Sequence, residues 1–216
     1  RYYLQSGMTH AFLIPDMVNQ LLNALDAQSL AAPPMEFKLN VAGGFISRKL
    51  AGQLIDRVTT DLINVYGSTE TNVAVLESAV TNLDELHWLP SNECRRVEII
   101  DECGNLCPVG AEGQLRIRLQ ELDCFSYLDD PQASEKVFQD GYLYPGDMAV
   151  RRADGRIRIL GRSADVINFR GQKLSVAPIE YEIQNRLGVS AICLFSGIND
   201  EGEEVVIVME AEQWPA

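Results

Sequence analysis

The residues with the clearest chemical potential stand together in the segment Tyr66-Gly67-Ser68-Thr69-Glu70. Gly67 lets the backbone approach a ligand closely, and the hydroxyls of Ser68 and Thr69 can donate hydrogen bonds to phosphate oxygens. Glu70 would repel a polyanion unless a divalent cation lay between them. The segment alone therefore indicates a site for a magnesium-bound nucleotide, and an ordinary strand-to-loop turn is the structural alternative.

A second group of polar residues follows in Gly146-Asp147, Asp154-Gly155 and Gly161-Arg162. The carboxylate of Asp147 can accept two hydrogen bonds from the vicinal diol of a ribose. The guanidinium of Arg162 can donate to ribose or phosphate oxygens. Taken singly, the Asp-Gly pair is a common hairpin turn, and an arginine after a glycine is more often a solvated surface charge.

The elements around the first group form a recognisable unit. Residues 37–42 and 62–66 are apolar runs that we predict as strands, and between them Ser47 is placed to cap a helix over residues 48–58. A strand, a helix and a strand with short links make a βαβ unit with parallel strands and a right-handed crossover. Gly43-Gly44 and Gly67 then lie at the carboxyl ends of neighbouring strands, where open α/β sheets bind ligands.

The flanking segments are simpler. We predict a strand over residues 8–14 and a helix that Pro15 opens. After residue 90, short alternating segments indicate a small β-barrel or sheet, with strands at 96–100, 114–119, 141–150 and 156–160. A short helix should follow Asp130-Pro131. The last part predicts a hairpin over 168–174, a helix over 176–187 and strands at 190–195 and 204–210.

Composition excludes several classes of function. The chain carries 18 Lys and Arg against 31 Asp and Glu, which gives a net charge of −13. It has no basic stripe of the kind that binds nucleic acid, so we expect no nucleic-acid partner. No apolar run approaches membrane-spanning length, so we expect no membrane span.

Cysteine and histidine usage narrows the chemistry further. Only His10 and His87 are present, which leaves few members for a Ser-His-Asp triad, and an HExxH metal helix is absent. The five cysteines are scattered, and their spacing is not that of a zinc knuckle. We expect reduced, mostly buried thiols in a cytoplasmic protein. They are Cys94, Cys103, Cys107, Cys124 and Cys193.

Taken together, YGSTE followed by GD, DG and GR resembles the AMP-forming adenylating enzymes. This superfamily includes the acyl- and aryl-CoA synthetases, the luciferases and the adenylation domains of nonribosomal peptide synthetases, and the texture is most similar to the acyl-CoA synthetases. The resemblance runs through nearly the whole chain. It includes Ala42-Gly43-Gly44, Tyr127-Leu128-Asp129-Asp130-Pro131, Asp140-Gly141-Tyr142, Arg170-Gly171-Gln172-Lys173 and Ile179-Glu180.

The resemblance implies a role for each matching residue. Tyr66 would stack on adenine, and Asp147 would hold the ribose hydroxyls. Thr69 and Glu70 would be the catalytic residues, with Thr69 on the α-phosphate of ATP and Glu70 holding Mg²⁺. The nucleotide-binding set as a whole would be Tyr66, Gly67, Ser68, Thr69, Asp147 and Arg162.

The resemblance also implies the reaction and its other partners. A carboxylic acid bordered by Gly43 and Gly44 would attack the α-phosphorus of ATP, giving an acyl-adenylate and pyrophosphate. A thiol, from coenzyme A or a carrier-protein pantetheine, would then take the acyl group. Arg170 and Lys173 would lie on the phosphate or thiol side. The protein's contribution would be positioning and charge neutralisation.

The expected fold is α/β plus β, with three parts. A parallel-strand βαβ subdomain with the YGSTE loop would span residues 1–90. A small β-barrel subdomain with the second polar group would span 91–162. A truncated α+β piece, the beginning of a mobile C-terminal domain, would span 163–216.

Several departures from the superfamily's sequence pattern leave alternative functions open. Ala164 stands where the superfamily often has a hinge Asp or Lys, and Asp165 comes one residue later. The superfamily's phosphate loop and C-terminal lysine would fall outside the chain. The chain starts without Met, so we expect an excerpt. Because it would lack this loop and this lysine, we expect the excerpt to be inactive alone. The alternatives are a non-catalytic nucleotide-binding or regulatory module, an adenylation domain of a nonribosomal peptide synthetase, and a purely structural domain.

Overall fold

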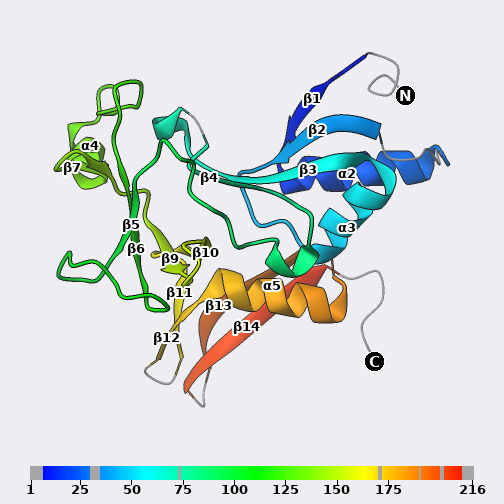
Figure 1. Ribbon diagram of the computed structural model, residues 1–216. Helices are drawn as coiled ribbons and strands as arrows, with labels where there is room; N and C mark the ends of the chain where they lie inside the picture. Colours follow the sequence, from blue (N-terminus) through cyan, green and yellow to red (C-terminus); the bar gives the residue numbers. More distant parts are fainter. Residues whose placement is uncertain are drawn as a thin grey trace.

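The computed structural model describes residues 7–29, 35–72, 74–169, 172–189, 191–199 and 202–210. They form a mixed α/β fold, as predicted, with a separate hydrophobic core in each of three regions. Figure 1 shows the first sheet with its helices, the second sheet beside it, and a long helix with a hairpin below both.

The first sheet has the order β1-β2-β3-β4. β1 and β2 are parallel, β2 and β3 are parallel, and β4 runs antiparallel to β3. The predicted parallel βαβ unit is therefore confirmed, whereas β4 was not predicted. The elements are β1 (His10–Leu13), α2 (Pro15–Ala27), β2 (Met35–Val41), α3 (Arg48–Arg57), β3 (Thr59–Tyr66) and β4 (Leu76–Ala79).

Local sequence explains where the two helices begin. Pro15 stands at the start of α2, where its missing N–H costs no hydrogen bond. Ser47 caps α3 as predicted, because its Oγ accepts a hydrogen bond from the N–H of Leu50 at 3.2 Å. Residues spaced by one helical turn then pack against the sheet in one core, which includes Val18, Leu22, Ala51, Leu54, Leu39 and Val41.

The second sheet has the order β10-β9-β6-β8-β7, with β5 paired to the other edge of β6. No pairing among the described residues closes this path, so it is an open six-stranded sheet and the predicted barrel is not shown. Its strands are β5 (Val97–Ile100), β6 (Glu112–Arg118), β7 (Phe138–Gln139), β8 (Tyr142–Leu143), β9 (Asp147–Arg151) and β10 (Ile157–Arg162).

One predicted strand in this sheet is wrong. Residues 141–150 do not form a single strand, because β8 ends at Leu143 and β9 begins at Asp147. Pro145 lacks the N–H that a ladder needs, and Gly146 has φ +82°, a left-handed conformation. The break turns the chain so that Asp147 opens β9. The predicted helix α4 (Pro131–Val137) is present and is capped by Asp130, whose Oδ1 accepts from Ala133 N.

The C-terminal segment contains two hairpins and a helix. They are β11 (Val166–Phe169), β12 (Gln172–Ser175), α5 (Val176–Leu187), β13 (Ala191–Asn199) and β14 (Gly202–Glu210). The predicted hairpin and helix are confirmed, and β13 is longer than predicted. The helix also contacts the first region, because Lys49 Nζ donates to the carbonyl of Gly188 at 3.1 Å.

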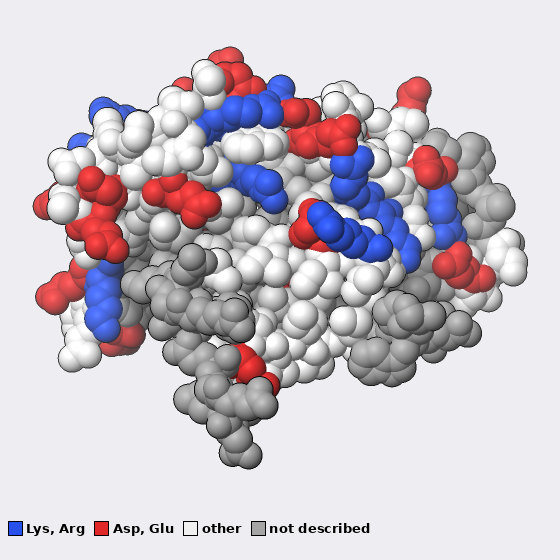
Figure 2. Space-filling view, turned by 90° about the horizontal axis from the view of Figure 1, so that it is seen from below, with Lys and Arg blue, Asp and Glu red and all other residues white. Residues whose placement is uncertain are grey.

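The surface is mixed in charge. On the face shown in Figure 2, Lys and Arg side chains lie beside Asp and Glu instead of forming a continuous basic stripe. Among the described residues, no helix is long and apolar enough to cross a membrane.

Candidate functional site

A cleft of about 430 Å³ opens where the first sheet meets the second. Its upper wall comes from the turns that follow β2 and β3, at the carboxyl ends of these parallel strands, as predicted. Its lower wall comes from the start of β9 and the end of β10. Seven residues singled out in the sequence line it together: Gly43, Gly44, Tyr66, Gly67, Ser68, Asp147 and Arg162.

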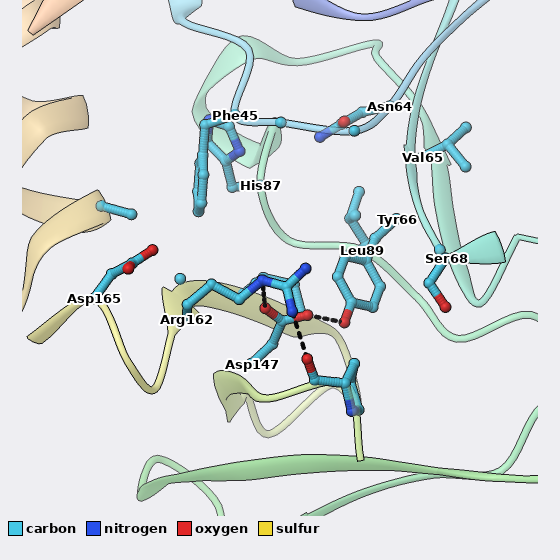
Figure 3. Close-up of a pocket in the computed structure, with 17 residues that line it drawn as sticks. Phe45, Asn64, Val65, Tyr66, Ser68, His87, Leu89, Asp147, Arg162 and Asp165 are labelled. Carbon is cyan, nitrogen blue, oxygen red and sulfur yellow. Dashed lines mark hydrogen bonds and ion pairs between the residues drawn. The ribbon is translucent and has the colours of Figure 1, made fainter. Parts of the chain in front are cut away.

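Asp147 is the polar centre of the cleft. The hydroxyl of Tyr66 donates to Asp147 Oδ2, and Arg162 Nε lies 3.1 Å from Oδ1. Figure 3 shows both side chains converging on this carboxylate. The register of β9 and β10 explains the second contact, because Arg162 pairs directly with Asp147. Arg162 is fixed further by its hydrogen bond to the carbonyl of Pro145.

Burial governs the electrostatics of this cluster. Asp147 is only 6% exposed, and this desolvation raises the pKa of its carboxyl, although Tyr66 and Arg162 act against the rise. Burial, followed by the charge of Asp147, also raises the pKa of Tyr66 well above its usual range. The phenol therefore stays protonated at neutral pH and serves as a hydrogen-bond donor.

Thr69 and Glu70 stand just beyond the cleft lining, in the 3₁₀ turn η1 (Thr69–Thr71). Thr69 is exposed. Glu70 Oε1 accepts a hydrogen bond from the hydroxyl of Tyr127 at 2.6 Å. Burial disfavours the Glu70 carboxylate, but hydrogen bonds, led by that of Tyr127, outweigh it and lower its pKa. The charge of Arg162 also lowers the pKa of Glu70, and it acts in the same direction on the pKa of Asp147. Arg162 therefore interacts electrostatically with both carboxylates.

This donor set suits Mg²⁺ that arrives with a phosphate ligand. The described residues contain no group of three or more His, Cys, Asp or Glu side chains that could hold a metal ion by themselves. Mg²⁺ commonly takes only one or two protein carboxylates and fills its remaining positions with substrate phosphates and water. A single ionised Glu70 beside the exposed hydroxyl of Thr69 meets that requirement.

A buried ion pair holds the loop that carries Glu70. Arg95 and Asp123 pair through two contacts, Nη1–Oδ2 at 2.5 Å and Nη2–Oδ1 at 2.7 Å, and their side chains are 2% and 0% exposed. Arg95 Nη2 also donates to the carbonyl of Thr71, the last residue of η1. Asn72, with φ +57°, then ends the turn in a left-handed conformation.

The opposite end of the cleft is lined by Gly43, Gly44 and two ring side chains. Gly43 has φ +78°, and an added Cβ would lie 3.2 Å from Cγ2 of Ile14. Phe45 and His87 follow, with ring centroids 5.3 Å apart. Burial, and then the charge of Arg158, lowers the pKa of His87 to about 4, so the imidazole is neutral at pH 7.

Several of these residues escaped sequence analysis. Phe45 and His87 belong to no sequence motif. Arg95 and Asp123 are far apart in the sequence, and no spacing rule predicts that they pair. Tyr127 was among the residues that resemble the superfamily, but nothing in the local sequence predicted its hydrogen bond to Glu70. Of the two residues assigned to the C-terminal side, Arg170 lies outside the described residues, and Lys173 is described only as a backbone position of β12 opposite Asn168.

The fold and site define an α/β protein whose ligand cleft lies at the carboxyl ends of parallel strands and is closed by a second sheet. The chain belongs to the family of AMP-binding enzymes, whose model matches residues 1–122. The predicted superfamily is therefore confirmed.

Known relatives agree with this membership. Human acyl-coenzyme A synthetase ACSM2A is 27% identical over 150 residues, which cover 68% of this chain and 26% of the relative. The D-alanine–D-alanyl carrier protein ligase of Listeria innocua is 28% identical over 176 residues, covering 76% and 34%. Both relatives are ligases, the class predicted from the sequence. The chain spans about a quarter to a third of their lengths.

A solved structure agrees in fold. O-succinylbenzoate coenzyme A synthetase from Bacillus subtilis, in complex with ATP and magnesium ion, matches with a TM-score of 0.79 at 18% identity. The match covers 96% of this chain and 42% of that protein. At this identity the likeness concerns the architecture alone.

Proposed function

We propose that the full-length protein is an ATP-dependent ligase that activates a carboxylic acid as its acyl-adenylate and releases pyrophosphate. The observation that carries the proposal is the convergence of the Tyr66–Ser68 turn with the Asp147–Arg162 pair on one cleft. These groups come from two different sheets. Together they offer an aromatic face, small-residue backbone and a carboxylate with a guanidinium, the set that an adenosine phosphate requires.

In this proposal Asp147 accepts from the ribose hydroxyls and Tyr66 stacks on adenine. Both Asp147 oxygens already have partners, Tyr66 on one and Arg162 on the other. A ribose diol must therefore share or replace these bonds. The Arg162 side chain is 60% exposed, so it can turn outward to ribose or phosphate oxygens when the ligand arrives.

At the phosphate end, Thr69 donates to the α-phosphate and Glu70 holds Mg²⁺. The ion, when bound, neutralises phosphate charge and makes the α-phosphorus easier to attack. Glu70 contributes an ionised carboxylate, since its hydrogen bonds lower its pKa. Gly67 and Ser68 let the chain pass close to the phosphates. These roles are positioning and electrostatic stabilisation, without a covalent enzyme intermediate.

The acid occupies the end bordered by Gly43 and Gly44. A thiol of coenzyme A or of a carrier-protein pantetheine then accepts the acyl group as a thioester and AMP leaves, in keeping with the names of the acyl-coenzyme A synthetase and carrier protein ligase among the relatives. Arg170 and Lys173 serve the phosphate or thiol side.

The division into residues 1–90, 91–162 and 163–216 belongs to the same proposal. Three separate cores support three parts, although Val75, Leu76 and Leu89 pack in the second core and not in the first. We place the protein in the reducing cytoplasm, in keeping with five free cysteines. The expectation that these thiols are mostly buried is wrong, because four are exposed and Cys107 is half-buried.

Acid-dependent exchange of pyrophosphate into ATP tests the proposal. The full-length protein should catalyse exchange with at least one acid of a broad panel. Glu70→Ala and Asp147→Ala should each lower the rate about a hundredfold or more. Glu36→Ala, an exposed acid outside the cleft lining, is the matched control and should keep the wild-type rate. Full activity in Glu70→Ala would refute the assigned role.

A binding or regulatory module of the same fold is the second candidate. Ala164 at the usual hinge position favours it, because a small apolar side chain lacks the charge expected there. Titration with ATP and AMP beside the exchange assay separates the two candidates. Nucleotide affinity without exchange would support the module, whereas Asp147→Ala binding nucleotide as well as wild type would leave only a structural role.

A further inference from the structure

Glu70 does not stand alone at the phosphate end of the cleft. Tyr127, 57 residues later, donates its phenolic hydrogen to Glu70 Oε1 at 2.6 Å. The Tyr127 loop also holds the backbone of the same residue, because the N–H of Cys124 donates to the Glu70 carbonyl at 2.8 Å. One loop therefore fixes both ends of the residue proposed to hold Mg²⁺.

Tyr127 is itself held firmly in place. Its backbone N–H donates to Ser134 Oγ at 2.8 Å, and that hydroxyl donates to the Asp130 carbonyl at 2.7 Å, within the first turn of α4. Its ring packs edge-on against Phe138 with centroids 5.2 Å apart. The phenol is thus attached to a helix and a strand of the second sheet, and it can fix the direction of a partner.

The direction of the bond fixes the role of Tyr127. An ionised carboxylate can only accept hydrogen bonds, so the phenol is the donor and Glu70 Oε1 is the acceptor. A carboxylate has about four lone-pair sites, and one donor on Oε1 leaves others for a metal ion.

We propose that Tyr127 is the positioning residue that orients the Glu70 carboxylate toward the divalent cation of the bound nucleotide. The inference rests on the proposed function of Glu70 and adds a residue to it. Mg²⁺ demands near-ideal octahedral geometry, so a carboxylate free to rotate binds it less well. Loss of a group that orients a metal ligand typically weakens metal affinity 10- to 100-fold.

Tyr127→Phe in the full-length protein tests the proposal, because it keeps the ring and its packing on Phe138 but removes the donor. Tyr142→Phe is the matched control: it removes another phenol-to-carboxylate bond, to Glu98 Oε1 at 3.3 Å, at a site outside the cleft lining. Mn²⁺ binding in the presence of a non-hydrolysable ATP analogue is measured from the loss of the free-ion electron paramagnetic resonance signal. The Mg²⁺ concentration for half-maximal exchange is measured in parallel.

We expect Tyr127→Phe to weaken Mn²⁺ binding and raise the half-maximal Mg²⁺ concentration about tenfold. Its affinity for the analogue without divalent cation should match that of wild type, and Tyr142→Phe should change neither quantity. Unchanged metal binding in Tyr127→Phe would overturn the inference and leave the proposed function intact. A metal-free loss of analogue affinity would overturn it too, since that outcome marks a collapsed loop. A wild-type protein that binds no metal–nucleotide would overturn both proposals.

Discussion

The hydroxyl of Tyr66 donates a hydrogen bond to Asp147 across 81 residues of sequence. Tyr66 ends β3 in the first sheet, and Asp147 begins β9 in the second sheet. The bond therefore joins the two walls of the cleft at its centre. Because Arg162 occupies the other carboxylate oxygen, the polar site is organised before any ligand binds.

Replacing Asp147 with Asn should stabilise the free protein. Burial raises the Asp147 pKa in the folded state, so ionisation costs stability, and that cost grows as pH rises through the folded pKa. The amide can still accept from Tyr66. We expect an unfolding free energy higher by roughly 1 kcal/mol at pH 7, about 2–4 °C in midpoint, with loss of nucleotide affinity. Calorimetry of both proteins at pH 4 and 7 checks this. An unfolding midpoint at pH 7 that is lower for Asp147→Asn than for wild type would contradict the prediction.

His87 should make stability depend on pH in the acid range. Its folded pKa of about 4 lies below the ordinary 6.5, so the unfolded chain binds the proton more readily between these values. The stabilising effect of the neutral ring is full above pH 6.5 and is lost as pH falls toward 4, by up to about 3 kcal/mol. Urea unfolding from pH 4 to 7 should show this slope, and His87→Phe should reduce it. Exposed His10, mutated to Phe, should leave it unchanged.

Breaking the buried Arg95–Asp123 pair should be costly. Asp123→Ala leaves the Arg95 guanidinium, 2% exposed, without its counter-ion, which typically costs about 3–5 kcal/mol. The double variant Arg95→Met/Asp123→Leu removes both charges and should lose less. Chemical denaturation of the three proteins measures the difference. A double variant no more stable than Asp123→Ala would show that the hydrogen bond to Thr71 matters more than the stranded charge.

Gly161 should not tolerate a side chain. It has φ +114°, and an added Cβ would lie 2.9 Å from the Cβ of Ala177 in α5. We expect Gly161→Ala to cost about 3 kcal/mol, from backbone strain and overpacking together. Gly155 has φ +86° but open space around it, so Gly155→Ala isolates the strain and should cost about 1 kcal/mol. Adding Ala177→Gly to Gly161→Ala should recover part of the loss.

Much of the fold could be predicted from local patterns. Pro15 and Ser47 marked helix starts that the structure contains, and the apolar runs before Gly43 and Gly67 became parallel strands. The break at Pro145-Gly146 was missed, although a Pro-Gly pair is itself a turn signal, because apolar residues on both sides of it suggested one strand. Whether the second sheet closes into a barrel could not be predicted from local patterns either, because closure depends on which distant strand edges pair.

The sequence by itself determined the chemical inventory: a glycine turn with hydroxyls and a carboxylate, an aspartate and an arginine at strand ends, and membership in a family. These features are carried by residue type and short spacing, which a linear chain displays directly. Tertiary structure alone decided that Tyr66 and Arg162 share Asp147, and that Tyr127 holds Glu70. Those contacts depend on strand register and on the packing of separate sheets, which are settled only when distant segments bury their apolar faces together.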